Sequence, residues 1–470
     1  MQCAWEASVL ENLTADQVTS DSRKAGPEKV FFAFPSWAHD VKDFVDDAIQ
    51  HGCREVVLSP QDVVDSRDVK FHVTTDVVGV FAQVLHRLLP VNNHSLWGVT
   101  GTNGKTTVTY LIRHLLGRPT ALIGSIVDDL LVESHEAAQT TPSLESLYRM
   151  IAAIPKNTPV AIELSSHGLD QRRHCGLQFD AAIFTNLTSD HLDYHGDSMA
   201  YFTAKRKLFT DAPKPRCNVF NIGDPYGERL WRELWGVTYG VNVPADYQAQ
   251  NIQLRPEGTF FNLKHYGKCY PCRSPLLGDF NVENALAAIA AIHEVEGIEL
   301  EKLCQRLATF PGVPGRLERI IQINGVTIFV DFAHTEDGLR RVLQTLQKLK
   351  PKKIITVFGC GGDRDRTKRP KMMQVACERS SLVIATADNP RHEAIEDIFH
   401  DMRLGVQHRN VLFEPDRRQA IEMALQRAQP GDIVLIAGKG HERYQVVGDQ
   451  KIPFSDQDCV RTYFEAAKVL

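Results

Sequence analysis

Short apolar runs that end in polar or glycine-rich residues recur along this 470-residue chain. In its last third they read VTIFVDFAH, KKIITVFGCGG, SLVIATAD and DIVLIAGKG, and a helical pattern follows each of them. Buried strands that alternate with helices predict a parallel sheet wrapped by helices. Ligands of such sheets bind beyond the carboxyl ends of the strands, so we expect the four polar tails to share one rim.

The arrangement of predicted strands and helices changes at two places along the chain, which predicts three α/β domains. Residues 1–92 carry short strands (KVFFAFP, REVVLS) and one helical pattern, and the linker PVNNHS follows. Strand–helix alternation then begins at LWGVTGTNGKTT and is interrupted by a strand-rich patch, YQAQNIQLRPEGTFFNLKHYGKCYPCRSPLL. After FPGVPGR the last set of strands begins. We therefore place domains at 1–92, 93–315 and 316–470, in keeping with a chain too long for one core.

Composition indicates a soluble globular protein, with 43% hydrophobic and 24% charged residues. A net charge of −5 argues against a surface that coats nucleic acid. No run of about 18 apolar residues exists, so no transmembrane helix is expected. The start, MQCAWEASVLENLTADQ, lacks a basic region followed by an apolar one, so we expect no signal peptide and a cytoplasmic location.

The 10 cysteines are not arranged as a disulfide framework. Only Cys269 and Cys272 have metal or redox spacing, and no second pair accompanies them. We interpret them as two ordinary thiols in a strand-rich region.

The segment VTGTNGKTTVTYLIRHLL has the order strand, glycine loop, helix. Backbone N–H groups at such a helix start can face a phosphate chain. Lys105 would supply charge to the β- and γ-phosphates, and the Thr106 hydroxyl suits Mg²⁺. The strict G-x-x-x-x-G-K-[ST] pattern would place glycine at Val99, so this is a variant of the loop. The alternative is a glycine turn with a solvated lysine.

The loop TGTNGKTT resembles the nucleotide loop of the Mur ligases, ATP-dependent enzymes that build the peptide stem of peptidoglycan. From about Asp21 to Glu442 the chain resembles this family in ten further segments, in order. They are TTPSLE, ELSSHGLDQRR, FTNLTSDHLDYHGD, AKRKLF, GDFNVEN, PGRLE, VDFAHTEDGL, GCGGDRDRTKRPKM, DNPRHE and AGKGHE. The pattern is most similar to the members that add the third amino acid to UDP-N-acetylmuramoyl-L-alanyl-D-glutamate.

The resemblance implies a UDP-muramoyl-binding first domain, a central P-loop-type ATPase domain and a Rossmann-like third domain that binds the amino acid. Amide synthesis through an acyl phosphate brings several anions together, so the site needs cations as well as ATP and Mg²⁺. The resemblance assigns Mg²⁺ to Thr106, Glu163, His191 and Lys205, the last as N6-carboxylysine. Without it, His191 reads as an ordinary histidine and Lys205 as part of a solvated basic face; a metalloprotease site at His191 and His195 fits poorly.

Contacts to ATP and to the muramoyl dipeptide also follow from the resemblance. Two departures from the family pattern fall in the uridine region near Trp37–His39, where Ser36 and Val41 stand in place of glycine. Two more are Phe332, in place of a usual tyrosine, and Glu336, in place of a usual proline. The ATP set is Gly101, Thr102, Asn103, Gly104, Lys105, Thr106, Thr107, Asn281, Arg316 and His334, and the dipeptide set is Ser22, Thr140, Thr141, Ser165, Gln171 and Arg173.

The turn DNPR ends one of the predicted strands and carries a fixed cation, Arg391. Pro390 restricts the backbone, and a guanidinium matches a carboxylate in two hydrogen bonds. The turn resembles that of the family members that add meso-2,6-diaminopimelate; those that add lysine lack the arginine. The expected amino-acid pocket comprises Arg364, Asp388, Asn389, Pro390, Arg391, Gly438 and Glu442. Without the family, GGDRDRTKRP reads as a solvated charge run.

Three rival functions are considered. A lysine-adding ligase disagrees with Arg391, and a folate-polyglutamate ligase leaves the first domain and DNPR without a role. A non-enzymatic scaffold predicts a transit peptide and damaged catalytic positions, whereas Lys105, Glu163, His191 and Lys205 are all present. The expected partners are the two small-molecule substrates, with no nucleic acid or membrane, and the chain is expected to be a monomer.

Overall fold

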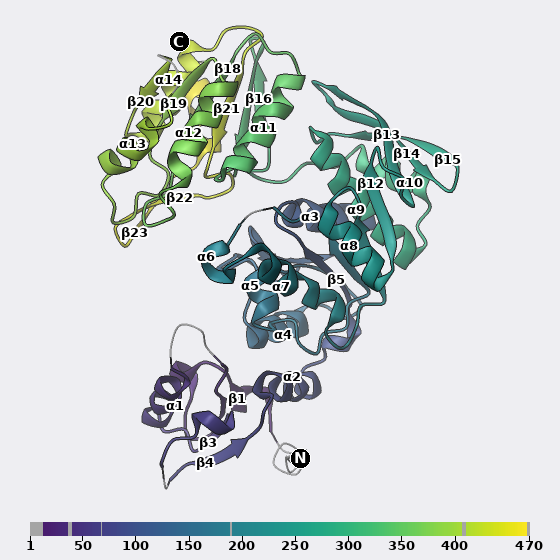
Figure 1. The fold of residues 1–470 in the computed structure, drawn as a ribbon, viewed down its shortest axis with the longest axis vertical. Coiled ribbons are helices and arrows are strands. Elements are labelled where there is room, and N and C mark those ends of the chain that lie inside the picture. Colours follow the sequence, from purple (N-terminus) through teal and green to yellow (C-terminus); the bar gives the residue numbers. More distant parts are fainter. Residues whose placement is uncertain (1–12, 36–39, 67, 189, 407–409, 468–470) are drawn as a thin grey trace. The chain divides into compact units, whose positions relative to one another are not determined.

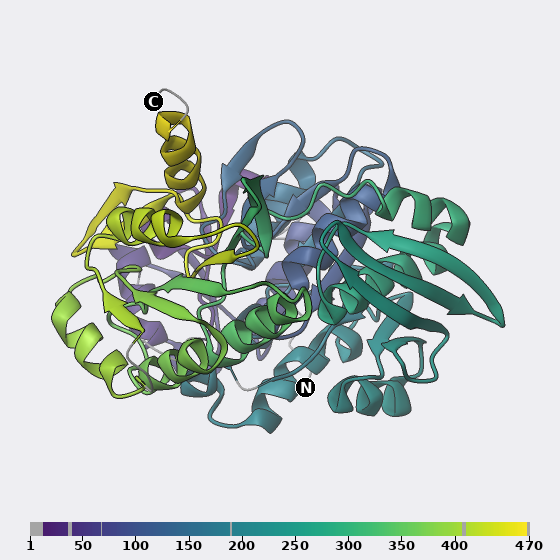
Figure 2. The ribbon, with the colours of Figure 1, turned by 90° about the horizontal axis from the view of Figure 1, so that it is seen from above.

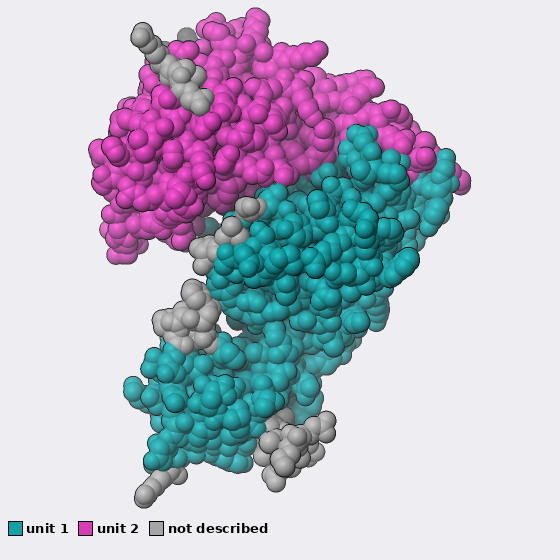
Figure 3. All heavy atoms as spheres, viewed as in Figure 1, with its two compact units in different colours: residues 1–248, 265–267, 283–303 teal, residues 249–264, 268–282, 304–470 magenta. Residues whose placement is uncertain are grey.

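The computed structural model describes residues 13–35, 40–66, 68–188, 190–406 and 410–467 (Figure 1). The chain divides into two compact units, coloured separately in Figure 3. The first comprises residues 1–248, 265–267 and 283–303, and the second comprises 249–264, 268–282 and 304–470. Among the described residues no helix has the length and apolar character needed to cross a membrane.

The first unit begins with a small parallel sheet in the order β1-β2-β3-β4. Because successive side chains of a strand point to opposite faces, Phe31 packs with Val56 beneath α1, whereas Phe32 packs with Phe81 of α2. Each helix begins at an aspartate, Asp40 or Asp76, whose carboxylate accepts a backbone N–H of the first turn. The elements are β1 (Val18–Thr19), β2 (Val30–Phe32), α1 (Val41–Gln50), β3 (Glu55–Leu58), β4 (Lys70–Val73) and α2 (Val77–Leu88).

A larger sheet follows, whose strands in this unit run in the order β12-β11-β10-β5-β9-β6-β7-β8. The pairs from β12 to β6 are parallel, and β7 and β8 are added antiparallel. Its central strands are mostly apolar and buried along almost their whole length, as expected where helices cover both faces. The strands are β5 (Ser95–Thr100), β6 (Ala121–Ile123), β7 (Val127–Asp129), β8 (Ser134–Glu136), β9 (Pro159–Glu163), β10 (Ala181–Phe184), β11 (Cys217–Asn221) and β12 (Val237–Val241).

Helices follow most of these strands, as the alternating pattern predicts. They are α3 (Lys105–Leu116), α4 (Leu144–Ala153), α5 (Ser166–Asp170), α6 (Leu192–His195), α7 (Ser198–Thr210) and α8 (Pro225–Leu234), and later α9 (Asp279–Glu296) and α10 (Leu300–Leu307).

The predicted strand-rich patch is confirmed as β13 (Tyr247–Arg255), β14 (Gly258–His265) and β15 (Lys268–Ser274), which neighbour one another in the order β15-β14-β13. Cys269 on β15 is exposed and unpaired with Cys272. Cys272 is buried, with its Sγ 2.7 Å from that of Cys304 at α10. The two thiols of CYPC therefore face different surroundings.

The second unit also contains a six-stranded sheet in the order β16-β17-β21-β18-β19-β20. Only β16 is antiparallel to its neighbour. The strands are β16 (Glu318–Ile323), β17 (Val326–Asp331), β18 (Ile354–Phe358), β19 (Leu382–Ala385), β20 (Val411–Phe413) and β21 (Ile433–Ala437), and a hairpin, β22 (Tyr444–Val447) and β23 (Gln450–Pro453), follows. The four apolar runs of the sequence are thus four parallel strands, and their polar tails do share one rim.

Helices cover both faces of this sheet (Figure 2). Leu343, Met373 and Phe399 bury one face, and Ile421 and Val460 bury the other. The first layer consists of α11 (Glu336–Lys348), α12 (Lys368–Arg379) and α13 (Ile395–Arg403), and the second of α14 (Arg417–Arg427) and α15 (Asp456–Ala467). The α/β fold class expected from the sequence is confirmed.

Candidate functional site

The phosphate loop joins β5 to α3 with the predicted strand–loop–helix geometry. Gly101 and Gly104 have φ angles of 147° and 91°, which favour glycine. A Cβ at Gly101 would also overlap Thr185 Oγ1, and one at Gly104 would overlap Asn284 Oδ1. The backbone N–H of Thr102 donates to Asn186 O at 2.8 Å, and that of Asn103 donates to Asn186 Oδ1 at 3.0 Å. The tail of β10 therefore fixes the loop, a role of Asn186 that the sequence analysis missed.

Two lysines converge on this loop. Lys105 Nζ donates to Gly101 O at 2.9 Å and to Thr102 O at 3.0 Å. Lys205, from α7, is only 1% exposed, and its Nζ donates to Gly101 O at 2.8 Å and lies 4.5 Å from the centre of the Tyr201 ring. Burial, together with the Lys105 charge, holds the pKa of the Lys205 amine well below its usual range. Lys205 is therefore not part of a solvated basic face.

Glu163 ends β9 beside the first turn of α3. Its Oε2 accepts hydrogen bonds of 2.9 Å from Thr106 Oγ1 and from Ser125 Oγ, and its Oε1 accepts one of 3.0 Å from Ser125 N. A hydroxyl and a carboxylate beside a phosphate loop form a donor set that suits Mg²⁺, which usually takes one or two carboxylates and several waters. Thr106 and Glu163, expected as metal ligands, thus lie together. Burial raises the pKa of nearby Asp128 to about 6.

His191 precedes α6 and has a φ of 52°, in the left-handed region. Its Nε2 lies 3.5 Å from Asp190 Oδ2, and its ring centre lies 4.9 Å from that of His167 and 6.2 Å from that of Tyr201. Among the described residues no group of three His, Cys, Asp or Glu side chains is gathered as a metal site. His191 as a metal ligand stays a prediction.

Apart from Ser22, the residues expected to hold the dipeptide form a connected hydrogen-bond network at the end of β9, in which Arg173 also donates to Thr141 O. Thr141 Oγ1 donates to Glu163 O at 2.8 Å and accepts from Ser165 N at 2.9 Å, and Ser125 Oγ lies 3.1 Å from Thr140 Oγ1. In the same network, Arg173 donates to Gln171 Oε1 through Nε at 3.0 Å and Nη2 at 2.7 Å. These side chains connect Glu163 to the wall of a cleft.

A cleft of about 1680 Å³ in the first unit contains Ser22, Gln171 and Arg173 in its lining. One ion pair and one hydrogen bond connect its walls. Asp76 pairs with Arg172 at 2.6 Å, and Glu145, which pairs with Arg149 within α4 at 3.0 Å, accepts a hydrogen bond from Ser20 N at 2.8 Å. The expected uridine contacts at Ser36 and Trp37–His39 lie outside the described residues, and Val41 begins α1.

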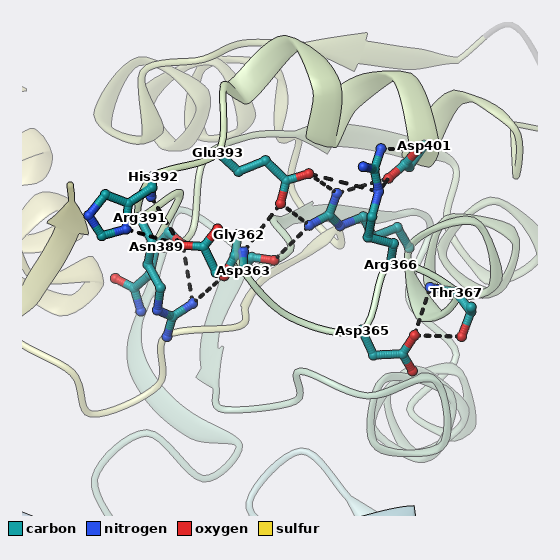
Figure 4. Close-up of polar contacts among 12 residues, drawn as sticks. Gly362, Asp363, Asp365, Arg366, Thr367, Asn389, Arg391, His392, Glu393 and Asp401 are labelled. Carbon is teal, nitrogen blue, oxygen red and sulfur yellow. Dashed lines mark hydrogen bonds and ion pairs between the residues drawn. The ribbon is translucent and has the colours of Figure 1, made fainter. Parts of the chain in front are cut away.

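In the second unit, the tails of β18, β19 and β21 meet around the DNPR turn. Figure 4 shows residues of the loop after β18 beside Asn389 and Arg391 of the turn. Asn389 connects them: its Oδ1 accepts Lys439 Nζ at 3.0 Å, and its Nδ2 donates to Glu442 Oε2 at 2.9 Å. Lys439 is completely buried and also pairs with Glu442 at 2.8 Å. Burial raises the pKa of Asp388. Sequence reasoning overlooked Lys439, which lies within the quoted AGKGHE.

Arg391 is held mainly through its backbone. Its N–H donates to Val446 O at 3.0 Å, its carbonyl accepts Gly448 N at 2.8 Å, and its φ is 52°. The guanidinium donates through Nη1 to Gly362 O at 2.7 Å, with a longer 3.5 Å contact to Asn389 O. Its Nε and Nη2 make no hydrogen bond or ion pair within the described ranges, so one edge of the fork can bind a ligand. Arg364 is exposed on the facing loop.

The remaining expected ATP contacts lie in the second unit. Arg316 stacks over the Phe332 ring at 4.6 Å, and His334 packs on the same ring at 4.7 Å. Asn281 Nδ2 donates to Leu277 O at 2.9 Å. Glu336 lies in the first turn of α11, where a negative charge favours the helix, and pairs with Arg340 at 2.8 Å. The departures at Phe332 and Glu336 therefore fit the local structure.

A glycine-rich loop between a parallel strand and a helix, with a buried carboxylate hydrogen-bonded to its threonine, is typical of a protein that binds a nucleoside triphosphate. Family models identify the class: the Mur ligase middle domain matches residues 99–292, and the Mur ligase glutamate ligase domain matches residues 315–440. The chain belongs to the Mur ligase family and is an ATP-dependent amide ligase.

Individual relatives cover nearly the whole chain. A protein of Thermosynechococcus vestitus named UDP-N-acetylmuramoyl-L-alanyl-D-glutamate–2,6-diaminopimelate ligase is 40% identical over 96% of this chain and 93% of its own. One of the same name from Lactiplantibacillus plantarum is 38% identical over 99% and 96%. A solved structure with this name has a TM-score of 0.69 at 33% identity, covering 96% of this chain and 95% of its own. The resemblance found in the sequence is confirmed.

Proposed function

We propose that the chain joins meso-2,6-diaminopimelate to the D-glutamate of UDP-N-acetylmuramoyl-L-alanyl-D-glutamate, in the cytoplasm, during the synthesis of peptidoglycan precursors. The observation that carries the choice of amino acid is the fixed guanidinium of Arg391, whose Nε and Nη2 edge has no partner among the described residues. The names of the relatives at 40% and 38% identity support the same substrate.

In the first step the glutamate carboxylate attacks the γ-phosphorus of ATP, and the bond to the β-phosphate oxygen breaks to release ADP. The N–H groups of the phosphate loop and Lys105 hold the transferring phosphate. Thr106 and Glu163 would hold Mg²⁺, which neutralises phosphate charge when bound. Asn281, Arg316 and His334 are assigned as further contacts to the nucleotide.

In the second step the amine of the amino acid attacks the carbonyl carbon of the acyl phosphate. The new C–N bond forms, inorganic phosphate leaves and the amine gives up a proton. The dipeptide is held for this step by Thr140, Thr141, Ser165, Gln171 and Arg173, and its uridine end by Ser22. Positioning of the two reactants accounts for much of such a rate gain.

Lys205 is assigned a carbamate. The neutral form of its amine would form an N–C bond with CO₂ and release one proton, which gives a carboxylate that suits a second Mg²⁺, and the lowered pKa favours that form of the amine. The Gly101 carbonyl and the Tyr201 ring hold the side chain toward the phosphate loop. His191 would serve as a further ligand.

The distal carboxylate of diaminopimelate is assigned to Arg391, with Arg364 beside it. Asp388, Asn389, Pro390 and Gly438 shape the turn and its neighbour strand. Glu442 suits an ammonium group of the amino acid. Lysine lacks the distal carboxylate and would leave the guanidinium desolvated without a partner, so a lysine-adding ligase is disfavoured.

The test is a selectivity assay with purified protein, ATP and the UDP-linked dipeptide. Phosphate release that depends on the dipeptide and on diaminopimelate, with little turnover of lysine, supports the proposal. Equal use of lysine would assign the chain to the lysine-adding ligases, and no dipeptide-dependent turnover with any amino acid would leave the scaffold role. Size-exclusion chromatography with light scattering tests the expected monomer.

A further inference from the structure

A buried arginine lies behind the turn that carries Arg391. Arg369, in the first turn of α12, is 0% exposed. Its Nη1 and Nη2 donate to the two carboxylate oxygens of Glu393 at 2.7 and 2.6 Å, and Nη1 also donates to Asp401 Oδ2 at 2.8 Å. Figure 4 labels both acidic partners. A guanidinium and a carboxylate joined by two parallel hydrogen bonds form a strong and geometrically specific pair.

The Arg369–Glu393 pair connects two loops of the rim. Arg369 Nη2 donates to Gly361 O at 3.2 Å, and Glu393 Oε2 accepts Asp363 N at 3.2 Å, so both partners bind the loop after β18. Glu393 N donates to Pro390 O at 3.1 Å within the DNPR turn. The hydrogen bond from Arg369 holds the pKa of Glu393 below its usual range, so the carboxylate stays charged near neutral pH.

The loop after β18 is also what holds the Arg391 side chain. Arg391 Nη1 donates to Gly362 O, one residue from each of the two loop positions that the buried pair contacts. Gly362 N in turn donates to Asn389 O at 2.9 Å, and a Cβ on Gly362 would overlap Pro390 O. The loop after β18 and the DNPR turn are therefore in close contact. A shift of one relative to the other would move Gly362 O away from the Arg391 guanidinium.

We infer that Arg369 and Glu393 are positioning residues that fix the loop after β18 against the DNPR turn and so set the direction of the Arg391 guanidinium toward the amino-acid substrate. Arg369 cannot touch a ligand, because its side chain is fully buried. Its effect passes through Glu393 and through the Gly361 and Gly362 carbonyls. The inference rests on the proposed role of Arg391.

Glu393→Gln is the variant that tests it, because the amide keeps the size of the side chain and loses the charge-assisted fork. Complete loss of a desolvated charge partner weakens binding by roughly 30-fold or more, so a guanidinium that is only displaced should raise the KM for diaminopimelate on the order of 10-fold. The kcat at saturation and the KM for ATP should stay within about twofold, since the phosphate loop is untouched.

Arg366→Gln is the matched control. Arg366 donates to the same Asp401 at 2.8 and 3.1 Å, but it is 59% exposed, reaches Glu393 only at 3.9 Å and has no hydrogen bond to residues 361–363 among the described contacts. We expect wild-type KM for diaminopimelate in this variant. In an Arg391→Ala background, Glu393→Gln should add little further rise, because coupled residues are not additive.

Wild-type turnover with diaminopimelate, measured first, tests the proposed function separately. If it is present, an unchanged KM in Glu393→Gln, or a full additional rise in the Arg391→Ala background, overturns the positioning role. If it is absent, crystal structures of wild type and Glu393→Gln decide: loss of the 2.7 Å contact from Arg391 Nη1 to Gly362 O supports the role, and its retention overturns it. Arg369→Lys, which keeps the charge without the fork, should behave as Glu393→Gln does.

Discussion

Lys105 and Lys205 donate to the same carbonyl oxygen, that of Gly101, from two different helices. Burial, followed by the charge of Lys105, lowers the pKa of the Lys205 amine. Under the proposed function the two residues would divide their roles: Lys105, at the start of α3, would carry the positive charge of the phosphate loop, and Lys205 would react with CO₂.

Removal of the Lys105 charge should slow the reaction with little effect on folding. Lys105→Ala takes away a cation that matters most as charge shifts onto the transferring oxygens, so we expect kcat to fall on the order of 10²–10³-fold. The thermal midpoint should change little. The control is Lys302→Ala, which removes an exposed lysine on α10. Near-wild-type turnover of Lys105→Ala would remove this lysine from the mechanism.

Lys205→Ala should be nearly inactive, and small carboxylates such as formate or acetate should restore part of the activity, because they can replace the carbamate oxygens at the metal. The adjacent Arg206→Ala, which breaks only an exposed pair with Glu233 at 2.9 Å, should stay active and be indifferent to added carboxylate. A density map of an active crystal that shows a bare amine at Lys205 far from any metal would contradict the carbamate.

Arg391→Ala should weaken the binding of diaminopimelate and leave ATP and the dipeptide unaffected. Loss of one partner of a desolvated, hydrogen-bonded charge pair costs ~2–5 kcal/mol, so the KM should rise by roughly 30-fold or more. Arg391→Lys should recover only part of the loss, since an ammonium keeps the charge without the planar fork. An unchanged KM for diaminopimelate in Arg391→Ala would show that the turn merely ends a strand.

Stability should fall in mild acid because of His174. Both ring nitrogens of this buried histidine lack hydrogen bonds, and burial, followed by the charges of Arg172 and Lys207, lowers its pKa to about 4. An unfolded histidine, with a pKa near 6.5, binds a proton first, so the folded state loses up to about 1.4 kcal/mol per pH unit as the pH falls from about 6.5 toward 4. Pairing with Asp211, whose Oδ2 lies 3.6 Å from Nε2, would reduce the loss.

Urea unfolding of wild type and His174→Gln at pH 7 and pH 5 measures this effect. Wild type should lose about 2 kcal/mol more than the variant over that interval. Equal losses in the two proteins would mean that other groups control the acid sensitivity.

The elements of the fold that depend on local pattern could be predicted. The four apolar runs of the last third, and the run that leads into the loop from Gly101 to Thr106, each end in glycine or polar residues. The structure confirms that each run is a strand. What could not be predicted are partners that become neighbours only in the folded chain. Asn186 and Ser125 are ordinary polar residues in the sequence, and only the parallel order β10-β5-β9-β6 brings them to the phosphate loop and to Glu163.

The charge run GGDRDRTKRP contains both residues whose exposure could be predicted from the sequence and one whose burial could not. Its first charges, residues 363–366, are exposed, as expected for a solvated run. Arg369 is fully buried, because its helix turns it toward Glu393 and Asp401, 24 and 32 residues further along the chain. Arg364 and Arg366 are the same residue type as Arg369, so only the three-dimensional path of the chain distinguishes the exposed arginines from the buried one.

The backbone contacts of Arg391 also set an order of events during synthesis on the ribosome. Its N–H binds Val446 O, and Asn389 Oδ1 accepts Val446 N, which lies 57 residues downstream. Domains fold as the chain emerges, the first ones earliest. The nucleotide loop can therefore form while the last strands are still being translated, but the turn proposed to select the amino acid is completed only when β22 has left the exit tunnel. A nascent chain that stops before Val446 would carry its phosphate loop without the backbone contacts that order this turn.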